Sequence, residues 1–228
     1  IGSSNYTPQE MATRRMYLNR PDEFLLWYFE RFAKYRNIKP NLVHKWLSDK
    51  KVVTQNIDGL DRKAGNKSII PIHGSIDKVV LFQSQEQIPK LQDAPWFEVQ
   101  TKLGKENNRE YLKTLLLDAF KISSKTLSPE LDISLKPFVL LFDEFYSELY
   151  KISKAEQMFN EAQNFIFMGT SFSVNITNMA LQKAITRGCS ITIVDPDPIE
   201  LRVPRVKYYS MTAENYIKQV VFITDGAV

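Results

Sequence analysis

The sequence contains a single cysteine, Cys189, and no hydrophobic run long enough to cross a membrane. One cysteine cannot form a disulfide within the chain, and it cannot build a cysteine-rich metal site by itself. A transmembrane helix needs about 18 or more consecutive apolar residues, and neither such a stretch nor a recognisable signal peptide is present. We therefore predict an intracellular, cytoplasmic protein that does not associate with a membrane.

Charge of one sign is not in large excess. The chain has 30 lysines and arginines against 26 acidic residues, and the formal net charge is +4. The basic residues are spread along the chain, so we predict no nucleic-acid partner. A length of 228 residues with 43% hydrophobic and 25% charged residues is typical of one globular domain, or of one domain with a small lobe.

Apolar, β-branched runs that alternate with helical patterns predict an α/β fold. Strands are expected at 51–54, 69–72, 77–82, 136–142, 164–168 and 190–194, and helices at 22–35, 40–48, 107–121, 155–162, 179–187 and 213–221. From residue 136 onward strands and helices alternate, which predicts βαβ units and a parallel sheet. The mostly polar segment 83–126 predicts a mobile surface lobe around the helix at 107–121.

Small or polar residues follow three of the predicted strands. They are Gln55-Asn56, Gly169-Thr170-Ser171 and Asp195. In a doubly wound sheet the carboxyl ends of the strands line one crevice, where ligands bind. A glycine with two hydroxyl side chains suits a phosphate or a ribose, and a carboxylate at a strand end suits ribose hydroxyls. The residues alone therefore predict a nucleotide-binding α/β domain.

Five segments also occur in the order in which the sirtuin (Sir2) family has them. They are TQNIDGL at 54–60, HGS at 73–75, KPFVLLFDE at 136–144, FIFMGTSFSV at 165–174 and ITIVDPDP at 191–198. The sequence thus resembles a sirtuin over most of its length. The resemblance implies a Rossmann-like, doubly wound parallel sheet with a smaller, mostly helical lobe. It implies one catalytic domain, with the core at 40–80 and 134–228 and the lobe at 7–38 and 83–130.

The resemblance implies chemistry as well as a fold. Sirtuins cleave the nicotinamide–ribose bond of NAD and transfer the ADP-ribosyl group to the oxygen of an acyl-lysine amide. NAD is then the co-substrate, and the partner is an acylated protein lysine or another acceptor of ADP-ribose. His73 is implied as the base that activates a ribose hydroxyl, since an imidazole changes protonation near neutral pH. The alternative is a structural histidine with satisfied hydrogen bonds. His44 matches a packing histidine, and we predict that it is structural.

The other site residues follow from the same match. Asn56 is implied to hold the reacting ribose and a water, Asp58 the nicotinamide carboxamide, and Gln55 the ribose. The phosphate and ribose contacts are implied at Gly169, Thr170 and Ser171, with Asp195 near the adenosine ribose. The residues implied to lie beside the bound peptide, which the family pairs as an added strand, are Val139, Phe142, Asp143 and Glu144.

A finer match is to the class III branch of the sirtuins. Tyr28 and Arg31 fall on its Tyr-x-x-Arg pair, which binds the carboxylate of succinyl- or malonyl-lysine in that branch. A guanidinium and a phenol make a charge-assisted site for a carboxylate. The alternative is that Tyr28 packs in the core and that Arg31 lies on a solvated helix face.

Three departures from the family pattern affect these predictions. The first strand with its GAGxS phosphate loop is absent before Ile1, so we expect several tens more residues at the N-terminus of the protein. No cysteine lies between His73 and Lys136, so a four-cysteine zinc site cannot form there, and we expect no zinc. Asp195 replaces an asparagine. Asp143 replaces a glycine, which adds a carboxylate and removes glycine's backbone freedom where the peptide is expected to run.

These observations leave three hypotheses. The favoured one is an NAD-dependent protein-lysine deacylase, with succinyl- or malonyl-lysine as a possible substrate. The second is a Sir2-type NAD glycohydrolase or protein ADP-ribosyltransferase, which the altered peptide region and the missing zinc lobe favour. The third is a non-catalytic nucleotide sensor. His73 argues against the third hypothesis, because a sensor has no need of a base.

Overall fold

The computed structural model of the chain describes residues 6–32, 37–83, 87–203 and 205–225. The chain divides into two compact units. Unit 1 comprises residues 1–39, 53–60 and 69–152, and unit 2 comprises residues 40–52, 61–68 and 153–228. The last residues of the helix predicted at 22–35 lie outside the described residues.

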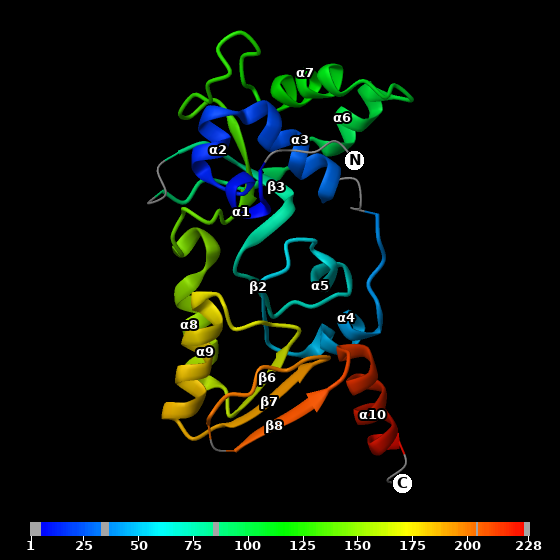
Figure 1. The fold of residues 1–228 in the computed structure, drawn as a ribbon, viewed down its shortest axis with the longest axis vertical. Coiled ribbons are helices and arrows are strands. Elements are labelled where there is room, and N and C mark those ends of the chain that lie inside the picture. The colour runs from blue at the N-terminus through cyan, green and yellow to red at the C-terminus, as the bar shows by residue number, and fades with distance from the viewer. Residues whose placement is uncertain (1–5, 33–36, 84–86, 204, 226–228) are drawn as a thin grey trace. The chain divides into compact units, whose positions relative to one another are not determined.

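Unit 1 combines helices with an antiparallel sheet. Its helices are α1 (Pro8–Met11), α2 (Arg14–Asn19), α3 (Pro21–Arg31), α6 (Trp96–Leu103), α7 (Arg109–Ala119) and a 3-10 turn at Glu148–Tyr150. Its three-stranded sheet has the order β4 (Gln92–Asp93), β3 (Gly74–Leu81), β5 (Leu135–Val139). The helix predicted at 107–121 is confirmed as α7, which packs against α3 (Figure 1).

The core of unit 1 is rich in aromatic side chains. Phe24 and Tyr28 of α3, Tyr17 of α2 and Trp96 of α6 are all almost completely buried. The indole N–H of Trp96 donates a hydrogen bond to the Ile76 carbonyl, at 2.6 Å. Aromatic rings bury a large apolar area each, so this cluster joins the helices to β3 and β5.

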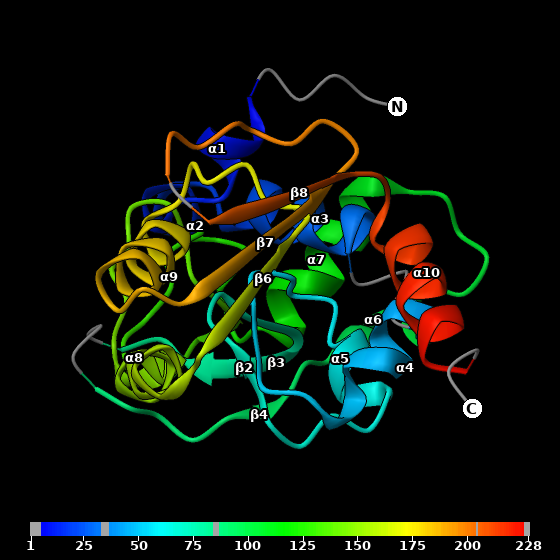
Figure 2. The same cartoon turned by 90° about the horizontal axis from the view of Figure 1, so that it is seen from below.

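Unit 2 contains a parallel sheet with helices on both faces. The strand order is β6 (Asn164–Met168), β7 (Ser190–Asp195), β8 (Val206–Ser210), and both pairs are parallel. The helices α8 (Ile152–Glu161) and α9 (Asn175–Thr186) cover one face, and α4 (Leu42–Trp46) and α10 (Ala213–Asp225) lie on the other (Figures 1 and 2). The parallel sheet predicted for this half of the chain is therefore confirmed at 164–195, and β8 is a strand that the sequence did not predict.

The prediction that residues 136–142 join this parallel sheet is wrong. β5 pairs with β3 in an antiparallel arrangement, with Val79 opposite Pro137 and Leu81 opposite Leu135. All five residues of β5 are buried, and such a run identifies a buried strand without identifying its partner. The partner is decided by the close approach of β3 to β5 at Gly74, described below.

β1 (Val52–Thr54) and β2 (Ile69–Pro71) form a separate two-stranded sheet, in which the Ile72 N–H donates to the Thr54 carbonyl at 3.0 Å. The short helix α5 (Leu60–Lys63) lies between them in the chain. Both strands lead directly into polar segments, at 55–58 and at His73. In the part of the chain that the structure describes, no helix has both the length and the apolar character needed to cross a membrane.

Candidate active site

His73 lies between β2 and β3, and its half-buried side chain contacts two other segments of unit 1. Its Nε2 atom is 2.9 Å from the hydroxyl oxygen of Tyr146, and the two rings stack with their centroids 5.9 Å apart. Burial lowers the pKa of His73, and a hydrogen bond with the Gln55 backbone opposes that shift in part. The ring is therefore neutral near pH 7, which is the form that can accept a proton.

Gly74 explains why His73 lies next to β5. A Cβ atom at Gly74 would lie 2.0 Å from the Phe138 carbonyl oxygen, and the residue has a φ of +87°. Only glycine allows both this backbone conformation and this close approach. The Leu140 N–H then donates to the His73 carbonyl at 3.0 Å, which attaches the histidine to the segment that follows β5.

The loop after β1 alternates between polar and apolar side chains. Ile57 packs against the core of unit 1, and its carbonyl accepts a hydrogen bond from the Ile76 N–H at 2.8 Å. Asn56 and Asp58, on either side, are exposed. The Asp58 carboxylate accepts from the Leu60 N–H at 2.9 Å, at the first residue of α5. The loop thus presents an amide and a carboxylate to solvent, and the Gln55 backbone joins it to His73.

A second group of predicted residues lies in unit 2, at the carboxyl edge of the parallel sheet. Met168 and Val194 are paired across β6 and β7, and the Gly169 N–H donates to the Val194 carbonyl at 3.0 Å. This register places Gly169-Thr170-Ser171 and Asp195 side by side at the ends of adjacent strands. The prediction that these strand ends meet is confirmed for β6 and β7. It is wrong for Gln55-Asn56, because β1 pairs with β2 in a separate two-stranded sheet.

Helix α9 begins just beyond this strand end. Its N-cap residue, Val174, provides no side-chain acceptor, so the first N–H groups of the 12-residue helix are not capped by that side chain. Uncapped N–H groups at a helix start favour an anion such as phosphate. The Ser171 and Ser173 hydroxyls are 2.7 Å apart in the connecting loop. The Asp195 carboxylate accepts from the Asp197 N–H at 2.9 Å.

The residues predicted to lie beside a peptide substrate differ greatly in exposure. Val139 is buried in β5, opposite Gly74, whereas Phe142 is 65% exposed. The Phe142 N–H donates to the Ala12 carbonyl at 2.9 Å, so this backbone group is paired within the chain. The Asp143 carboxylate accepts from the N–H groups of Arg14 and Arg15, the first two residues of α2.

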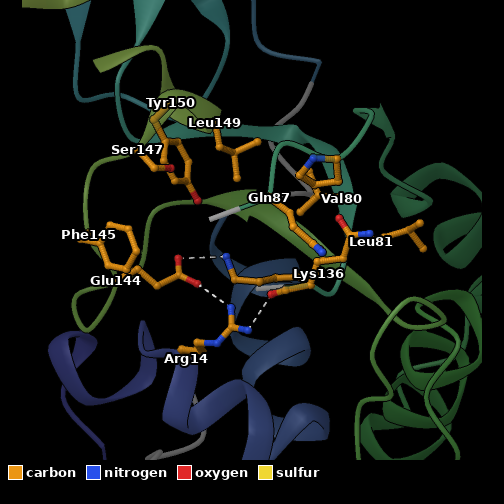
Figure 3. Close-up of a pocket in the computed structure, with 12 residues that line it drawn as sticks. Arg14, Val80, Leu81, Gln87, Lys136, Glu144, Phe145, Ser147, Leu149 and Tyr150 are labelled. Atoms are coloured by element: carbon orange, nitrogen blue, oxygen red, sulfur yellow. Dashed lines mark hydrogen bonds and ion pairs between the residues drawn. The ribbon is translucent and has the colours of Figure 1, made fainter. Parts of the chain in front are cut away.

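Glu144 lies in a buried ion network rather than on the surface. Its carboxylate is 3.1 Å from the Lys136 Nζ and 3.2 Å from an Arg14 guanidinium nitrogen, and the Lys136 and Glu144 side chains are only 5% and 3% exposed (Figure 3). Arg14 also donates to the Gln83 carbonyl at 2.8 Å. Burial lowers the pKa of Lys136, and the Glu144 carboxylate opposes this shift. The network borders a pocket that Tyr150 also lines.

Tyr28 and Arg31 have different environments although they lie on the same helix. Tyr28 is 2% exposed and packs against the rings of Phe24 and Trp27, with centroid distances of 4.8 and 4.9 Å. Burial raises the pKa of its hydroxyl. Arg31 is exposed, and its guanidinium lies over the Trp27 ring at 5.1 Å. This arrangement agrees with the packing alternative for Tyr28.

Comparison with known proteins identifies the family. The family model described as the Sir2 family matches residues 3–176. This chain belongs to the Sir2 family. The recognition made from the TQNIDGL and HGS segments is therefore confirmed. Relatives include an NAD-dependent protein deacylase of Bacteroides thetaiotaomicron, 25% identical over 88% of this chain and 77% of the relative. They also include NAD-dependent protein deacetylase 1 of Geobacillus kaustophilus, 25% identical over 87% of this chain and 72% of the relative.

Solved structures confirm the α/β, Rossmann-like fold class of this Sir2-family chain. A sirtuin from a study of substrate affinity matches with a TM-score of 0.73 at 20% identity, over 97% of this chain and 88% of that one. A Sir2 homologue in complex with NAD matches with a TM-score of 0.72 at 22% identity, over 97% of this chain and 79% of that one.

Sequence reasoning missed the partner of His73 in this Sir2-family chain. Tyr146 lies 73 residues from His73 in the chain and follows no pattern that marks a functional side chain. Arg14 and Lys136 were missed for the same reason, since a charge in the sequence shows neither its burial nor its ion-pair partner. His44 has the structural role that was predicted, because it forms a capping box with Asn41 at the start of α4.

Among the residues that the structure describes, no group of three or more histidine, cysteine, aspartate or glutamate side chains is arranged to hold a metal ion.

Proposed function

We propose that this Sir2-family chain is an NAD-dependent protein-lysine deacylase. The observation that carries the proposal is the neutral, half-buried His73, whose surroundings lower its pKa and leave its imidazole able to take a proton. In the proposed reaction the nicotinamide–ribose bond of NAD breaks, and the acyl oxygen of the lysine amide bonds to the ribose. His73 then removes the proton of a ribose hydroxyl, whose oxygen attacks the acyl carbon. The lysine amine leaves with a proton, and a water molecule adds to the acyl carbon, so that O-acyl-ADP-ribose is released.

We assign residues to NAD for each unit separately. In unit 1 we assign Asn56 to the reacting ribose and a water, Asp58 to the nicotinamide carboxamide and Gln55 to the ribose. The exposed amide and carboxylate of the loop after β1 are suitable hydrogen-bonding groups for these parts. In unit 2 we assign Gly169, Thr170 and Ser171 to phosphate and ribose, which the uncapped start of α9 supports. Asp195 is assigned to the adenosine ribose hydroxyls.

The test uses purified full-length protein with NAD and acetyl-, succinyl- or malonyl-lysine peptides, and mass spectrometry detects O-acyl-ADP-ribose. We expect this product with at least one peptide. Loss of a general base lowers the rate by about a hundredfold or more, so His73→Ala should reduce turnover at least that much. The matched control is His44→Ala, which removes the other histidine and should retain turnover. Absence of O-acyl-ADP-ribose with every peptide would contradict the proposal.

A preference for succinyl- or malonyl-lysine is a finer proposal, and it rests on Tyr28 and Arg31. The exposed guanidinium of Arg31 is able to pair with an acidic acyl group, and the Tyr28 hydroxyl is close enough to Glu144 for that carboxylate to raise its pKa. We expect Arg31→Met to lower turnover of the succinyl peptide at least about tenfold more than that of the acetyl peptide, since it removes a charge-assisted bond. Equal losses with both peptides would exclude the acidic-acyl preference.

One observation favours a second candidate, an NAD glycohydrolase or protein ADP-ribosyltransferase. The Phe142 N–H and the Asp143 carboxylate are both hydrogen-bonded to the segment at 12–15, in the region where a peptide substrate is expected to pair. Because these two groups are already hydrogen-bonded within the chain, this edge favours an acceptor other than a peptide strand, such as water or a side chain of another protein. Release of nicotinamide from NAD without any peptide, with free ADP-ribose or a labelled protein as product, would support this candidate.

A further inference from the structure

Tyr146 makes a specific contact with the proposed base. Its hydroxyl oxygen is 2.9 Å from Nε2 of His73, and its ring stacks on the imidazole with an interplanar angle of 23°. The two residues are therefore joined by both a polar and a ring contact, and both lie in unit 1.

The hydrogen-bonding capacity of His73 limits how many hydroxyl groups can donate to its ring. A neutral imidazole has one N–H donor and one nitrogen acceptor. The hydrogen bond with the Gln55 backbone raises the pKa of His73, which is the effect of a carbonyl that accepts from the ring N–H. With that ring N–H on Nδ1, the nitrogen that remains as acceptor is Nε2, and at 2.9 Å the Tyr146 hydroxyl is placed to donate to it. No acceptor is left on the ring for a second hydroxyl.

We propose that the Tyr146 hydroxyl and a ribose hydroxyl of NAD compete for the same lone pair, Nε2 of His73. Tyr146 holds the base in the neutral form with Nε2 unprotonated, and it has to move away before the base can act on the ribose. Tyr146 is thus a positioning residue that acts through His73. This inference rests on the proposed function, in which His73 takes a proton from NAD.

The segment around Tyr146 is anchored at both ends, so the required movement is local. On one side, Glu144 is buried in its ion pair with Lys136. On the other side, Tyr150 is buried and stacks on Phe138 with an interplanar angle of 7°. The stretch between these anchors is able to release one hydroxyl without unfolding β5 or the 3-10 turn.

The variant that tests the inference is Tyr146→Phe, because it keeps the ring and removes only the hydroxyl. A net neutral hydrogen bond corresponds to about a fivefold change in an equilibrium constant. We therefore expect the variant to bind NAD about fivefold more tightly, with a lower KM and no loss in kcat. The matched control is Tyr111→Phe, which removes a phenol hydroxyl from α7 and should leave NAD affinity unchanged.

A spectroscopic measurement tests the contact without any turnover. The chain has two histidines, so the ring ¹⁵N signals of His73 can be assigned in the full-length protein by comparison with a His44→Gln variant. We expect Tyr146→Phe to move the Nε2 signal toward that of an imidazole nitrogen with no hydrogen-bond donor, while the Nδ1 signal stays in place. Tyr111→Phe should move neither signal.

The outcomes separate this inference from the proposed function. An unchanged Nε2 signal, or weaker NAD binding by Tyr146→Phe, overturns the competition even if the protein is an active deacylase. A fall in kcat of tenfold or more also overturns it, because Tyr146 would then act during turnover. If the Nε2 signal moves and NAD affinity rises but no O-acyl-ADP-ribose is made, the competition stands and the deacylase proposal fails.

Discussion

The environment of His73 decides which protonation state this residue has in the folded protein. Its half-buried ring has a pKa below the ordinary value, because burial disfavours the imidazolium. In the proposed tautomer the Tyr146 hydroxyl donates to Nε2, which has no lone pair in the imidazolium, so this contact also favours the neutral ring. A base that is neutral at physiological pH is suited to accept a proton from a ribose hydroxyl.

The first prediction concerns pH. Because the folded pKa of His73 lies below 6.5, we expect kcat/KM for NAD to fall only at pH values below 6.5. The unfolded chain takes up the proton first, so the free energy of unfolding should also decrease as the pH falls below 6.5 and level off below the folded pKa. Activity and urea-unfolding profiles between pH 4 and 8 measure both effects. In His73→Gln the part of the pH dependence of unfolding that is due to this residue should disappear. A midpoint of the kcat/KM profile above pH 6.5 would contradict the prediction.

The second prediction concerns Gly74. We expect Gly74→Ala to lower the free energy of unfolding by about 3 kcal/mol or more, because the Cβ would clash with the Phe138 carbonyl in a conformation that already disfavours it. Urea unfolding measures this change. The matched control is Gly188→Ala, where φ is also positive but a Cβ would have no neighbour within 4 Å. That control should cost only about 1–2 kcal/mol, and equal losses in both variants would contradict the role of the close approach.

At the scale of an element, the start of helix α2 explains why position 143 has an aspartate where the family pattern has a glycine. Asp143, which replaces a glycine, accepts hydrogen bonds from the N–H groups of Arg14 and Arg15. Thr13 caps the same helix by accepting from the Met16 N–H at 3.0 Å. The helix start is therefore satisfied by two side chains, one of them from a distant segment, and the carboxylate interacts favourably with the positive end of the helix dipole.

The third prediction follows from this cap. Asp143→Gly, which restores the residue of the family pattern, should lower the free energy of unfolding by about 1–2 kcal/mol. Asp143→Asn should cost less, because an amide oxygen still accepts from a helix N–H. Urea unfolding of the three proteins gives the order. Unchanged stability of Asp143→Gly would show that the carboxylate does not stabilise α2.

A fourth prediction concerns the ion network beside β5. Glu144→Gln leaves the buried Lys136 and the partly buried Arg14 without this anionic partner, so we expect a loss of about 3–5 kcal/mol. Lys136→Met should cost less, because Glu144 keeps Arg14 and the Leu141 N–H, at 3.1 Å. Thermal unfolding ranks the two variants. The reverse order would mean that Lys136, rather than Glu144, is the centre of the network.

At the scale of the whole molecule, the proposed NAD residues belong to both compact units. His73, Asn56 and Asp58 lie in unit 1, and Gly169 and Asp195 lie in unit 2. A ligand that binds the folded chain stabilises it in proportion to the logarithm of its concentration over the dissociation constant. Each residue that we assign to NAD should therefore affect this stabilisation.

The fifth prediction is that NAD stabilises the chain against unfolding, by about 2.7 kcal/mol at a concentration a hundredfold above its dissociation constant. Asn56→Ala in unit 1 and Asp195→Ala in unit 2 should each reduce the shift in melting temperature that a fixed NAD concentration produces. The matched control is Asp197→Ala, which leaves the backbone N–H that donates to Asp195 in place. A melting-temperature shift that one of these two variants leaves unchanged would contradict the assignment of that residue to NAD.

Much of the local structure could be predicted because it depends on neighbouring residues. The runs at 164–168 and 190–194 are apolar enough to identify β6 and β7, and the helical spacing at 107–121 identified α7. β8 was missed, since its sequence VKYYS has a single aliphatic residue and none of its residues is buried. α6 was missed because only two of its eight residues, Trp96 and Val99, are buried. The cytoplasmic location and the division into a core and a lobe at the stated boundaries remain predictions.

The sequence by itself determined the family, the α/β class and the identity of His73 as the candidate base, because these follow from residue types at short spacing along the chain. Only the tertiary structure decided the antiparallel partner of β5, the burial of Glu144 and the contact between His73 and Tyr146. These depend on pairing between segments far apart in the chain, and no local pattern encodes which segments meet. Gly74 connects the sequence to the tertiary structure. The sequence shows that this residue has no side chain, and only the structure shows that a Cβ there would clash with the Phe138 carbonyl.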